Sequence, residues 1–219
     1  VIVLSNFVII PAITYGSQLA LGALGVTLVY GILRFSNFAH GDTMAFGTMV
    51  AILFTWWFQS IGVSIAPLPT ALLALPIAIV LTALLLLGTD RVVLRFYRKQ
   101  KSAPVILLIV SLGIMFVYNG LVRFIIGVGD QRFSDGSRFI ISARDFKKLT
   151  GLDEGLAIKT TQVITVITAV MVVALLFWFL NRTRTGKSMR AFSDNEDLAL
   201  LSGINPERVV LYTWLIAVS

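Results

Sequence analysis

The distribution of charged residues constrains this chain more than any other feature of its sequence. No Asp, Glu, Lys or Arg occurs in residues 1–33, 43–89, 102–122 or 160–181. A helix that crosses a bilayer needs roughly 20 consecutive apolar residues. Only 13% of the residues are charged, whereas a soluble domain carries about 25%. The chain is therefore predicted to be an integral membrane protein, and the run 43–89 is long enough to hold a pair of crossing helices.

Helices are the expected elements throughout, because a helix satisfies the backbone hydrogen bonds of a spanning segment internally. The predicted fold class is all-α, a polytopic transmembrane helical bundle. Residues 1–10 are also apolar and are expected either to form a short interfacial helix or to extend the first spanning helix. The predicted spanning helices are Pro11–Leu33, Thr43–Phe58, Leu68–Leu87, Pro104–Ile126 and Thr161–Leu180, and a sixth begins near Arg208.

The last residues of the chain, 209–219, are uncharged and follow directly on Arg208. Their length is about half of a spanning helix. A helix that stopped inside the bilayer would leave carbonyl groups unpaired in lipid. We therefore expect residues 1–219 to be a single transmembrane domain that is truncated at its C-terminus.

Counts of lysine and arginine predict the orientation, because cytoplasmic loops carry an excess of these residues. Residues 90–101 contain Asp90 as their one acid against a cluster of basic residues, and residues 181–190 contain basic residues and no acid. Both loops, and with them the segment 181–208, are predicted to be cytoplasmic. The same argument places the N-terminus outside and residues 34–42 near the cytoplasmic side.

The segment 129–160 is the predicted external loop. Its basic and acidic residues nearly balance, so it lacks the positive excess of a cytoplasmic loop. Its length favours a small folded cap, with turns expected at Gly129, Gly136 and Gly151.

A set of small residues is spaced by three or four positions along the first predicted helix. The set is Gly16, Ala20, Ala23, Thr27 and Gly31. This spacing places them on one helix face. Small residues allow the backbones of neighbouring helices to approach closely in lipid, so helix packing is the favoured interpretation. The alternative is a smooth wall beside a substrate path.

The segment 37–42 concentrates polar residues between two apolar runs. In a simple turn, Gly41 would take a positive φ and end one helix, while Asp42 would cap the next. If the turn lies within the bilayer, the broken helix must face protein or a water-filled cavity. Asn37, His40 and Asp42 would then mark a pathway or a gate. Both interpretations stay open. Because His40 is the only histidine, a histidine-rich metal site is excluded.

A second candidate segment is residues 186–209, on the predicted cytoplasmic side. Ser193 or Asp194 is expected to cap a short helix that runs to Leu201 and ends at Gly203. Such a helix has an apolar face of Leu198, Leu201 and Ile204 and an acidic face of Asp194, Glu196 and Asp197. A short amphipathic helix of this kind suits docking into a groove of another protein. The alternative is a loop helix that lies in solvent or on the membrane surface.

Two other interpretations of the charged residues are excluded. Residues 186–188 read Gly-Lys-Ser, like the end of a phosphate-binding loop, but the earlier glycine would fall on Asn181, and no strand precedes it. The net charge of +7 does not indicate nucleic acid, because the basic residues lie where membrane topology favours them. No cofactor is expected.

Residues 37–42 read N-F-A-H-G-D, and residues 190–205 read RAFSDNEDLALLSGIN. In these stretches the chain resembles the permease subunits of branched-chain amino-acid ABC transporters, of the type whose first helix pair is joined by an N-F-A-H-G-[DE] segment. The second stretch is similar to their coupling loop, which carries a degenerate E-A-A-x-x-x-G element. Asp197, Leu198, Ala199 and Gly203 keep that spacing, with Asp in place of Glu and Leu in place of the first Ala.

The resemblance implies a multi-pass subunit of the bacterial inner membrane for import of branched-chain or other small hydrophobic amino acids, with no enzymatic activity of its own. A second permease subunit, related but different, would complete the pathway. Two cytoplasmic ATPases would drive transport, and a periplasmic binding protein would deliver substrate. The resemblance assigns the pathway or gate to Asn37, His40, Gly41 and Asp42. It assigns ATPase coupling to Asp194, Glu196, Asp197, Leu198, Leu201 and Gly203.

Other functions are kept as alternatives. Urea and short-amide ABC permeases share this style of sequence. An ion-coupled secondary transporter would suit broken helices at mid-membrane, but it usually needs acidic or polar coupling residues deep in several helices, and Asp42 is the only acid in residues 1–89. A channel or a membrane scaffold protein is the last alternative, although no filter sequence is recognisable.

Overall fold

The computed structural model describes residues 4–63, 70–129, 139–141 and 157–218. Its contacts divide the chain into two compact units. Unit 1 comprises Val1–Ala23 and Ser134–Phe179, and unit 2 comprises Leu24–Phe133 and Leu180–Ser219. The long first helix runs from one unit into the other.

Unit 1 holds apolar helices and a small antiparallel sheet. The amide of Ala157, just before the second strand, donates a hydrogen bond to Asn6 Oδ1 over 3.0 Å. Phe139 pairs with Lys159 across the sheet. The elements are the π-helix η1 (Ser5–Ile9), the first part of α2 (Ile10–Leu33), β1 (Phe139–Ile141), β2 (Ile158–Lys159) and α8 (Thr160–Arg182).

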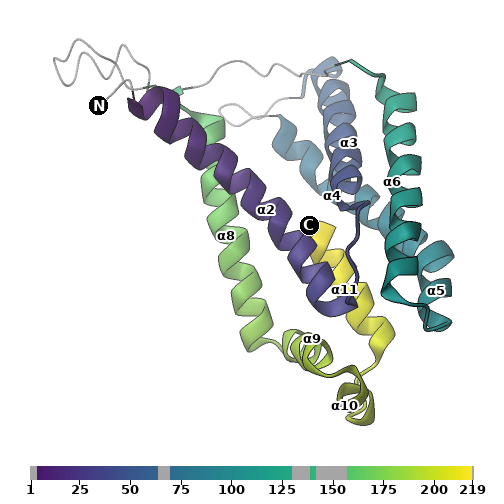
Figure 1. Cartoon of the computed structure of the whole chain (residues 1–219). Coiled ribbons are helices and arrows are strands. Elements are labelled where there is room, and N and C mark those ends of the chain that lie inside the picture. Colours follow the sequence, from purple (N-terminus) through teal and green to yellow (C-terminus); the bar gives the residue numbers. More distant parts are fainter. Residues whose placement is uncertain (1–3, 64–69, 130–138, 142–156, 219) are drawn as a thin grey trace. The chain divides into compact units, whose positions relative to one another are not determined.

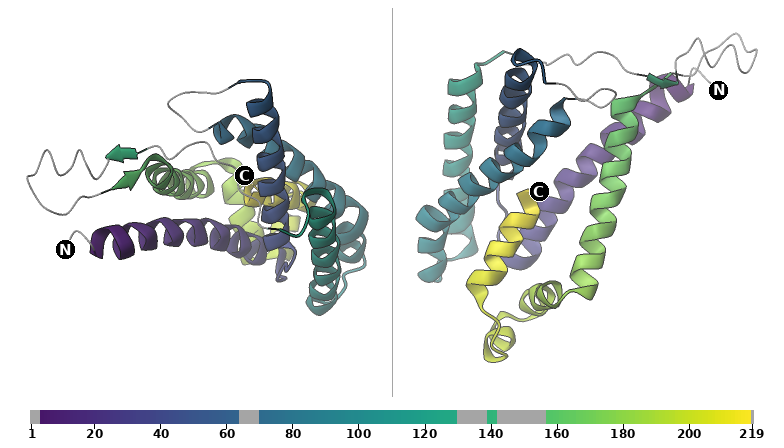
Figure 2. Two further views of the ribbon diagram at one scale, coloured as in Figure 1. Left: turned by 90° about the horizontal axis from the view of Figure 1, so that it is seen from above. Right: turned by 180° about the vertical axis from the view of Figure 1, so that it is seen from behind.

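Unit 2 contains the remaining helices (Figure 1). Helix α3 packs against α4 and α6, and α11 packs against α4 and α9. The further views in Figure 2 show α3 beside α6, with α4 crossing at an angle. The elements are α3 (His40–Ser60), α4 (Ala71–Thr89), the π-helix η2 (Asp90–Leu94), α5 (Arg95–Lys99), α6 (Pro104–Ile126), α9 (Arg184–Asp194), α10 (Glu196–Leu201) and α11 (Pro206–Val218).

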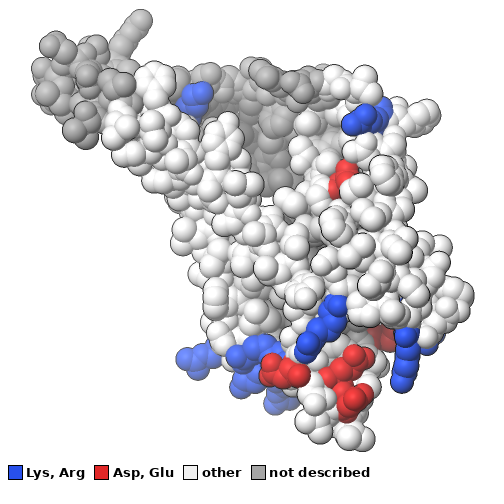
Figure 3. All heavy atoms as spheres, viewed as in Figure 1, with Lys and Arg blue, Asp and Glu red and all other residues white. Residues whose placement is uncertain are grey.

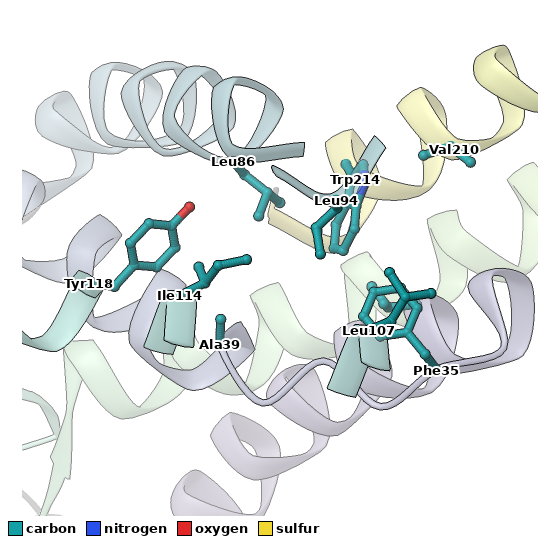
Figure 4. Packing of buried hydrophobic residues seen from close by; sticks show 10 residues of the cluster. Phe35, Ala39, Leu86, Leu94, Leu107, Ile114, Tyr118, Val210 and Trp214 are labelled. Carbon is teal, nitrogen blue, oxygen red and sulfur yellow. The ribbon is translucent and has the colours of Figure 1, made fainter. Parts of the chain in front are cut away.

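The core of unit 2 forms around the segment that joins α2 to α3. Phe35 and Ala39, from that segment, lie with Leu107 and Ile114 of α6 in one buried cluster (Figure 4), which also includes Trp214 of α11. The buried residues of this non-helical stretch thus pack among apolar side chains of several helices, where burial of apolar area stabilises them.

Most predicted helices are confirmed, and four described helices are long and apolar enough to cross a membrane. Pro104–Ile126 forms as predicted, and η1 extends the first helix back to Ser5. The helix predicted from Thr43 begins three residues earlier, at His40, and it is not among those four. The four candidate spans are Ser5–Leu33, Ala71–Lys99, Pro104–Ile126 and Thr160–Arg182. The chain is a helical, multi-pass membrane protein.

The prediction of a loop over residues 90–101 is wrong for most of its length. Helix α4 continues through η2 and α5 as far as Lys99. Charged side chains do not end a helix once it leaves the bilayer, and here Arg98 bonds back to Asp90 over 3.0 Å along the same helix. The turn is confined to the few residues before Pro104, where proline begins α6.

Charged side chains gather at one end of unit 2, the lower end in Figure 3. Arg34, Lys99 and Lys101 line the same cavity as Glu196 and Asp197 there. The two segments predicted to be cytoplasmic therefore lie together. That this end lies on the cytoplasmic side of the membrane stays a prediction. The predicted cap over 129–160, with Gly136 and Gly151, falls largely outside the described residues.

Candidate functional site

The first candidate segment is a break between two helices. Helix α2 ends at Leu33, residues 34–39 are not helical, and α3 starts at His40. The residue with a positive φ is Arg34, at 58°. A left-handed residue directly after a helix is a common way to end it.

The turn predicted at Gly41 is therefore wrong. Gly41 is the second residue of α3, and Asp42 lies in its first turn without capping it. Asn37 builds the turn instead: its carbonyl accepts from the amide of His40 at 3.3 Å, and its side-chain Oδ1 accepts from the amide of Ala39 at 3.2 Å. An asparagine side chain that accepts a hydrogen bond from the backbone two residues later stabilises a turn by itself, so the turn needs no glycine.

Two hydrogen bonds to α6 show where the break lies along the length of that helix. The amide of Phe38 donates to Ser111 Oγ at 3.1 Å, and Asn119 Nδ2 donates to Asp42 Oδ1 at 3.0 Å. Ser111 is seven residues beyond Pro104 and Asn119 is fifteen, which at 1.5 Å per residue is about 10 and about 22 Å along the helix. Since the hydrocarbon core is about 30 Å thick, the segment lies within the depth that α6 crosses.

Ser111 is the main polar support of this break. Its side chain is fully buried, and its hydroxyl accepts from Phe38 while donating to the carbonyl of Leu108 at 2.7 Å. Irregular backbone at membrane depth needs a partner of this kind, because lipid offers none. The break is thus enclosed in part: Asn37 and Ala39 are buried, whereas Phe38 is 50% exposed.

His40 lies where α2, α3 and α11 meet. It is 4% exposed, and its ring lies directly against Gly25 of α2. A Cβ built on Gly25 would come within 2.5 Å of His40 Nε2 and 3.2 Å of the carbonyl oxygen of Ala217. The absence of a side chain at Gly25 is therefore what admits the imidazole.

Asp42 and Gly41 present the other side of the same turn. The Asp42 carboxylate is half-buried beside Asn119, and negative charge in a first turn is favoured by the helix dipole. A Cβ built on Gly41 would meet nothing within 4 Å. The start of α3 therefore combines an enclosed imidazole with a carboxylate and a glycine that border open space.

Two of the small residues of α2 border open space on their side-chain face within the described part of the chain. A Cβ on Gly16 or Gly31 would meet nothing within 4 Å. Gly25, which the predicted set omits, is a glycine of α2 at which a built Cβ would meet another helix. Helix packing against a further chain or segment stays a prediction for Gly16, Ala20, Ala23, Thr27 and Gly31.

The second candidate segment forms two helices, α9 and α10, where one was predicted. The cap expected at Ser193 or Asp194 is wrong, because both residues belong to the end of α9. Asn195 caps α10, its Oδ1 accepting from the amide of Leu198 at 3.1 Å. The expected end is confirmed: α10 stops after Leu201, and Gly203 has a φ of 79°.

Helix α10 turns its large apolar side chains outward. Leu198 is 61% exposed and Leu201 is 85% exposed, whereas Ala199 is buried. Glu196 and Asp197 are exposed beside them. Exposed leucines on a helix at the charged end of unit 2 are an unsatisfied apolar surface.

Sequence reasoning missed several residues that hold this region together. Trp214 of α11 donates from Nε1 to Asp90 Oδ1 over 2.7 Å, and Arg95 donates from Nε to Glu207 over 3.0 Å. Polar residues inside an apolar run are the signal that could have indicated Ser111 and Asn119. Nothing in the local pattern indicates their partners.

A cavity of about 530 Å³ opens between these elements. Arg34, Lys99 and Lys101 bring positive charge to its lining, and Glu196 and Asp197 bring negative charge. Among the described residues, no group of three or more His, Cys, Asp or Glu side chains could hold a metal ion.

The family model for the branched-chain amino acid transport system / permease component matches residues 8–219. The chain belongs to this permease family. The match includes both candidate segments, so the helix break and the α9–α10 pair are features of a permease chain.

Curated relatives of this permease include several transport proteins. The high-affinity branched-chain amino acid transport system permease protein LivH of Salmonella typhimurium is 28% identical over 93% of this chain and 64% of that protein. BraD of Pseudomonas aeruginosa, described in the same words, is 26% identical over 95% of this chain and 65% of its own length. A probable LivH of Methanocaldococcus jannaschii is 27% identical over 94% and 60%.

The permease chain thus spans less than two thirds of the length of these relatives. No solved structure matches it.

Proposed function

We propose that this permease is a transport subunit of an ATP-driven importer for branched-chain or other small hydrophobic amino acids. The observation that carries the proposal is a family match over residues 8–219 in a chain that breaks a helix beside α6, a candidate membrane span. Transporters bind substrate beside broken helices, whose ends offer backbone groups and dipoles. The chain itself catalyses no reaction.

The broken segment supplies the pathway. Asn37 shapes the turn, and His40 fixes the start of α3 against α2 and α11. Gly41 and Asp42 face outward from the same turn, where a passing zwitterion meets few strong contacts. A substrate that must leave again is best held loosely, and the low charge of the membrane segments fits this requirement.

Helix α10 supplies the contact to the energy source. Its exposed leucines and acids suit a groove on a cytoplasmic ATPase. A pair of such ATPases, a second and different permease subunit, and a periplasmic binding protein complete the proposed complex. The complex resides in the bacterial inner membrane, with the charged end of unit 2 in the cytoplasm.

Reconstitution tests this function. The full-length permease is co-expressed with a candidate second permease, ATPase and binding protein from the same organism, purified through a tag on this subunit, and placed in liposomes. We expect the ATPase to co-purify and labelled leucine to accumulate only with ATP and binding protein. Competition by urea or acetamide but not by isoleucine would assign a short-amide substrate, and ATP-independent uptake driven by an ion gradient would overturn the proposal.

A further inference from the structure

Two helix C-termini meet at the charged end of unit 2. Helix α2 ends at Leu33 and α9 ends at Asp194. Ser193 Oγ donates a hydrogen bond to the carbonyl of Gly31 over 2.7 Å, and the guanidinium of Arg34 donates to the carbonyl of Ser193. Ser193 of α9 therefore supplies the partner for a carbonyl of α2, and Arg34, directly after α2, supplies the partner for a carbonyl of α9.

The two helix C-termini can lie this close together only with polar contacts between them. The last carbonyls of a helix have no partner within it, and the C-terminus of a helix carries a partial negative charge. Two such ends repel each other unless a donor or a cation lies between them. Arg34 provides the cation and Ser193 the hydroxyl, so these side chains hold together ends that would otherwise separate.

The contact between Ser193 and Arg34 joins the two candidate functional segments. Ser193 is two residues before Asn195, the cap of α10, which carries the proposed ATPase contact. Arg34 is the first residue of the helix break, and His40 follows six residues later. The backbone between them is tied to α6 through Ser111, so little slack separates the end of α9 from the start of α3.

We propose that Ser193 and Arg34 are the link through which a movement of the α9–α10 pair reaches the broken segment. They act as positioning residues and touch neither substrate nor nucleotide. The inference deepens the proposed function and rests on it. A second route runs through α11, which packs on α9 and α4, and the experiment separates the two.

Three variants of the complete transport complex address the link. Ser193→Ala removes the donor, and Ser193→Thr restores a hydroxyl. Arg34→Gly removes the guanidinium without forcing another side chain into the positive φ of 58° at this position. Glu207→Ala tests the second route, because it breaks a contact of α11 with α5 at the same end, the Arg95–Glu207 pair.

The readout is the ratio of leucine transported to ATP hydrolysed in liposomes. Coupling between sites amounts to about a fivefold change or more, so we expect Ser193→Ala and Arg34→Gly to lower the ratio by at least about fivefold. We expect Ser193→Thr and Glu207→Ala to stay within about twofold of the wild type. A wild-type ratio in Ser193→Ala would overturn the link and leave the proposed function intact, whereas a wild-type complex without ATP-dependent uptake would overturn both.

A structural measurement separates lost coupling from general damage. Residues 1–219 contain no cysteine, so within them spin labels attach only at introduced Tyr30→Cys on α2 and Lys187→Cys on α9. Both positions are exposed and lie outside the proposed ATPase contact. With a non-hydrolysable ATP analogue, we expect the distance between the labels to stay constant in the wild-type background and to change in Ser193→Ala. Equal changes in both backgrounds would show that movement does not pass through Ser193, which overturns the inference.

Discussion

At the scale of single residues, Gly25 has the tightest surroundings of the described glycines, because it lies against His40. The imidazole occupies the space that a side chain at position 25 would fill, and the carbonyl of Ala217 closes the same space from α11. Gly25 therefore decides whether α2, α3 and α11 can meet at this depth. A glycine costs helix stability, by roughly 0.5–1 kcal/mol relative to alanine, which the contact must offset.

Gly25→Ala is expected to destabilise the protein. The added Cβ would lie 2.5 Å from His40 Nε2, and overpacking of this kind costs about 1–3 kcal/mol. Thermal unfolding in detergent should show a lower midpoint than for the wild type. Gly88→Ala is the control, because a Cβ there meets nothing within 4 Å; its midpoint should be equal or higher. If the contact is the cause, adding His40→Ala should recover part of the loss, since changes at contacting residues are not additive. Additive losses would contradict it.

His40→Ala alone is expected to impair leucine uptake while expression and membrane insertion persist. The imidazole orients the start of α3, and its loss frees the turn that holds Gly41 and Asp42. Uptake by reconstituted complexes measures the effect, with Thr48→Ala, on an exposed position of the same helix, as the control. Uptake at the wild-type level would return residues 37–42 to a purely structural role.

At the scale of elements, the α9–α10 pair shows how a short helix can be held ready for a partner. A six-residue helix does not persist in water by itself. The Asn195 cap and the burial of Ala199 fix α10 on the permease, while Leu198 and Leu201 remain exposed. The element is thus anchored by one face and free on the other, which is the arrangement that docking requires.

Asp197→Lys combined with Leu198→Lys is expected to abolish ATPase docking and transport. The double change reverses charge and removes an exposed apolar contact, yet both side chains point away from the core, so membrane insertion should be unaffected. Co-purification of the ATPase measures docking. Arg91→Glu, also a charge reversal at an exposed position of the 90–101 segment, should retain the ATPase. Substrate-stimulated ATP hydrolysis at the wild-type rate in the double variant would remove α10 from the coupling role.

At the scale of the whole molecule, the sequence determined the helices better than the break between them. The predicted helix Pro104–Ile126 matches α6 to the residue, because lipid imposes both length and composition on a spanning helix. The depth of residues 37–42 was not predictable. It depends on Ser111 and Asn119, which lie more than seventy residues away along the chain. No local pattern carries such a pairing, and for the same reason the Trp214–Asp90 bond was missed.

Orientation in the membrane gives a prediction at this scale. Lysine and arginine counts place the charged end of unit 2 in the cytoplasm, so Leu201→Cys should react with a membrane-impermeant maleimide only in inside-out vesicles. Val128→Cys lies just past the end of α6 that is remote from the charged end of unit 2, and it should react only in intact spheroplasts. The side chains of Leu201 and Val128 are both 85% exposed, so a difference in exposure within the chain does not bias the comparison. The absence of native cysteine makes each label unambiguous within this chain. Labelling of Leu201→Cys from the outer face would put α10 beyond the reach of any cytoplasmic ATPase, and the proposed drive of transport would then be wrong.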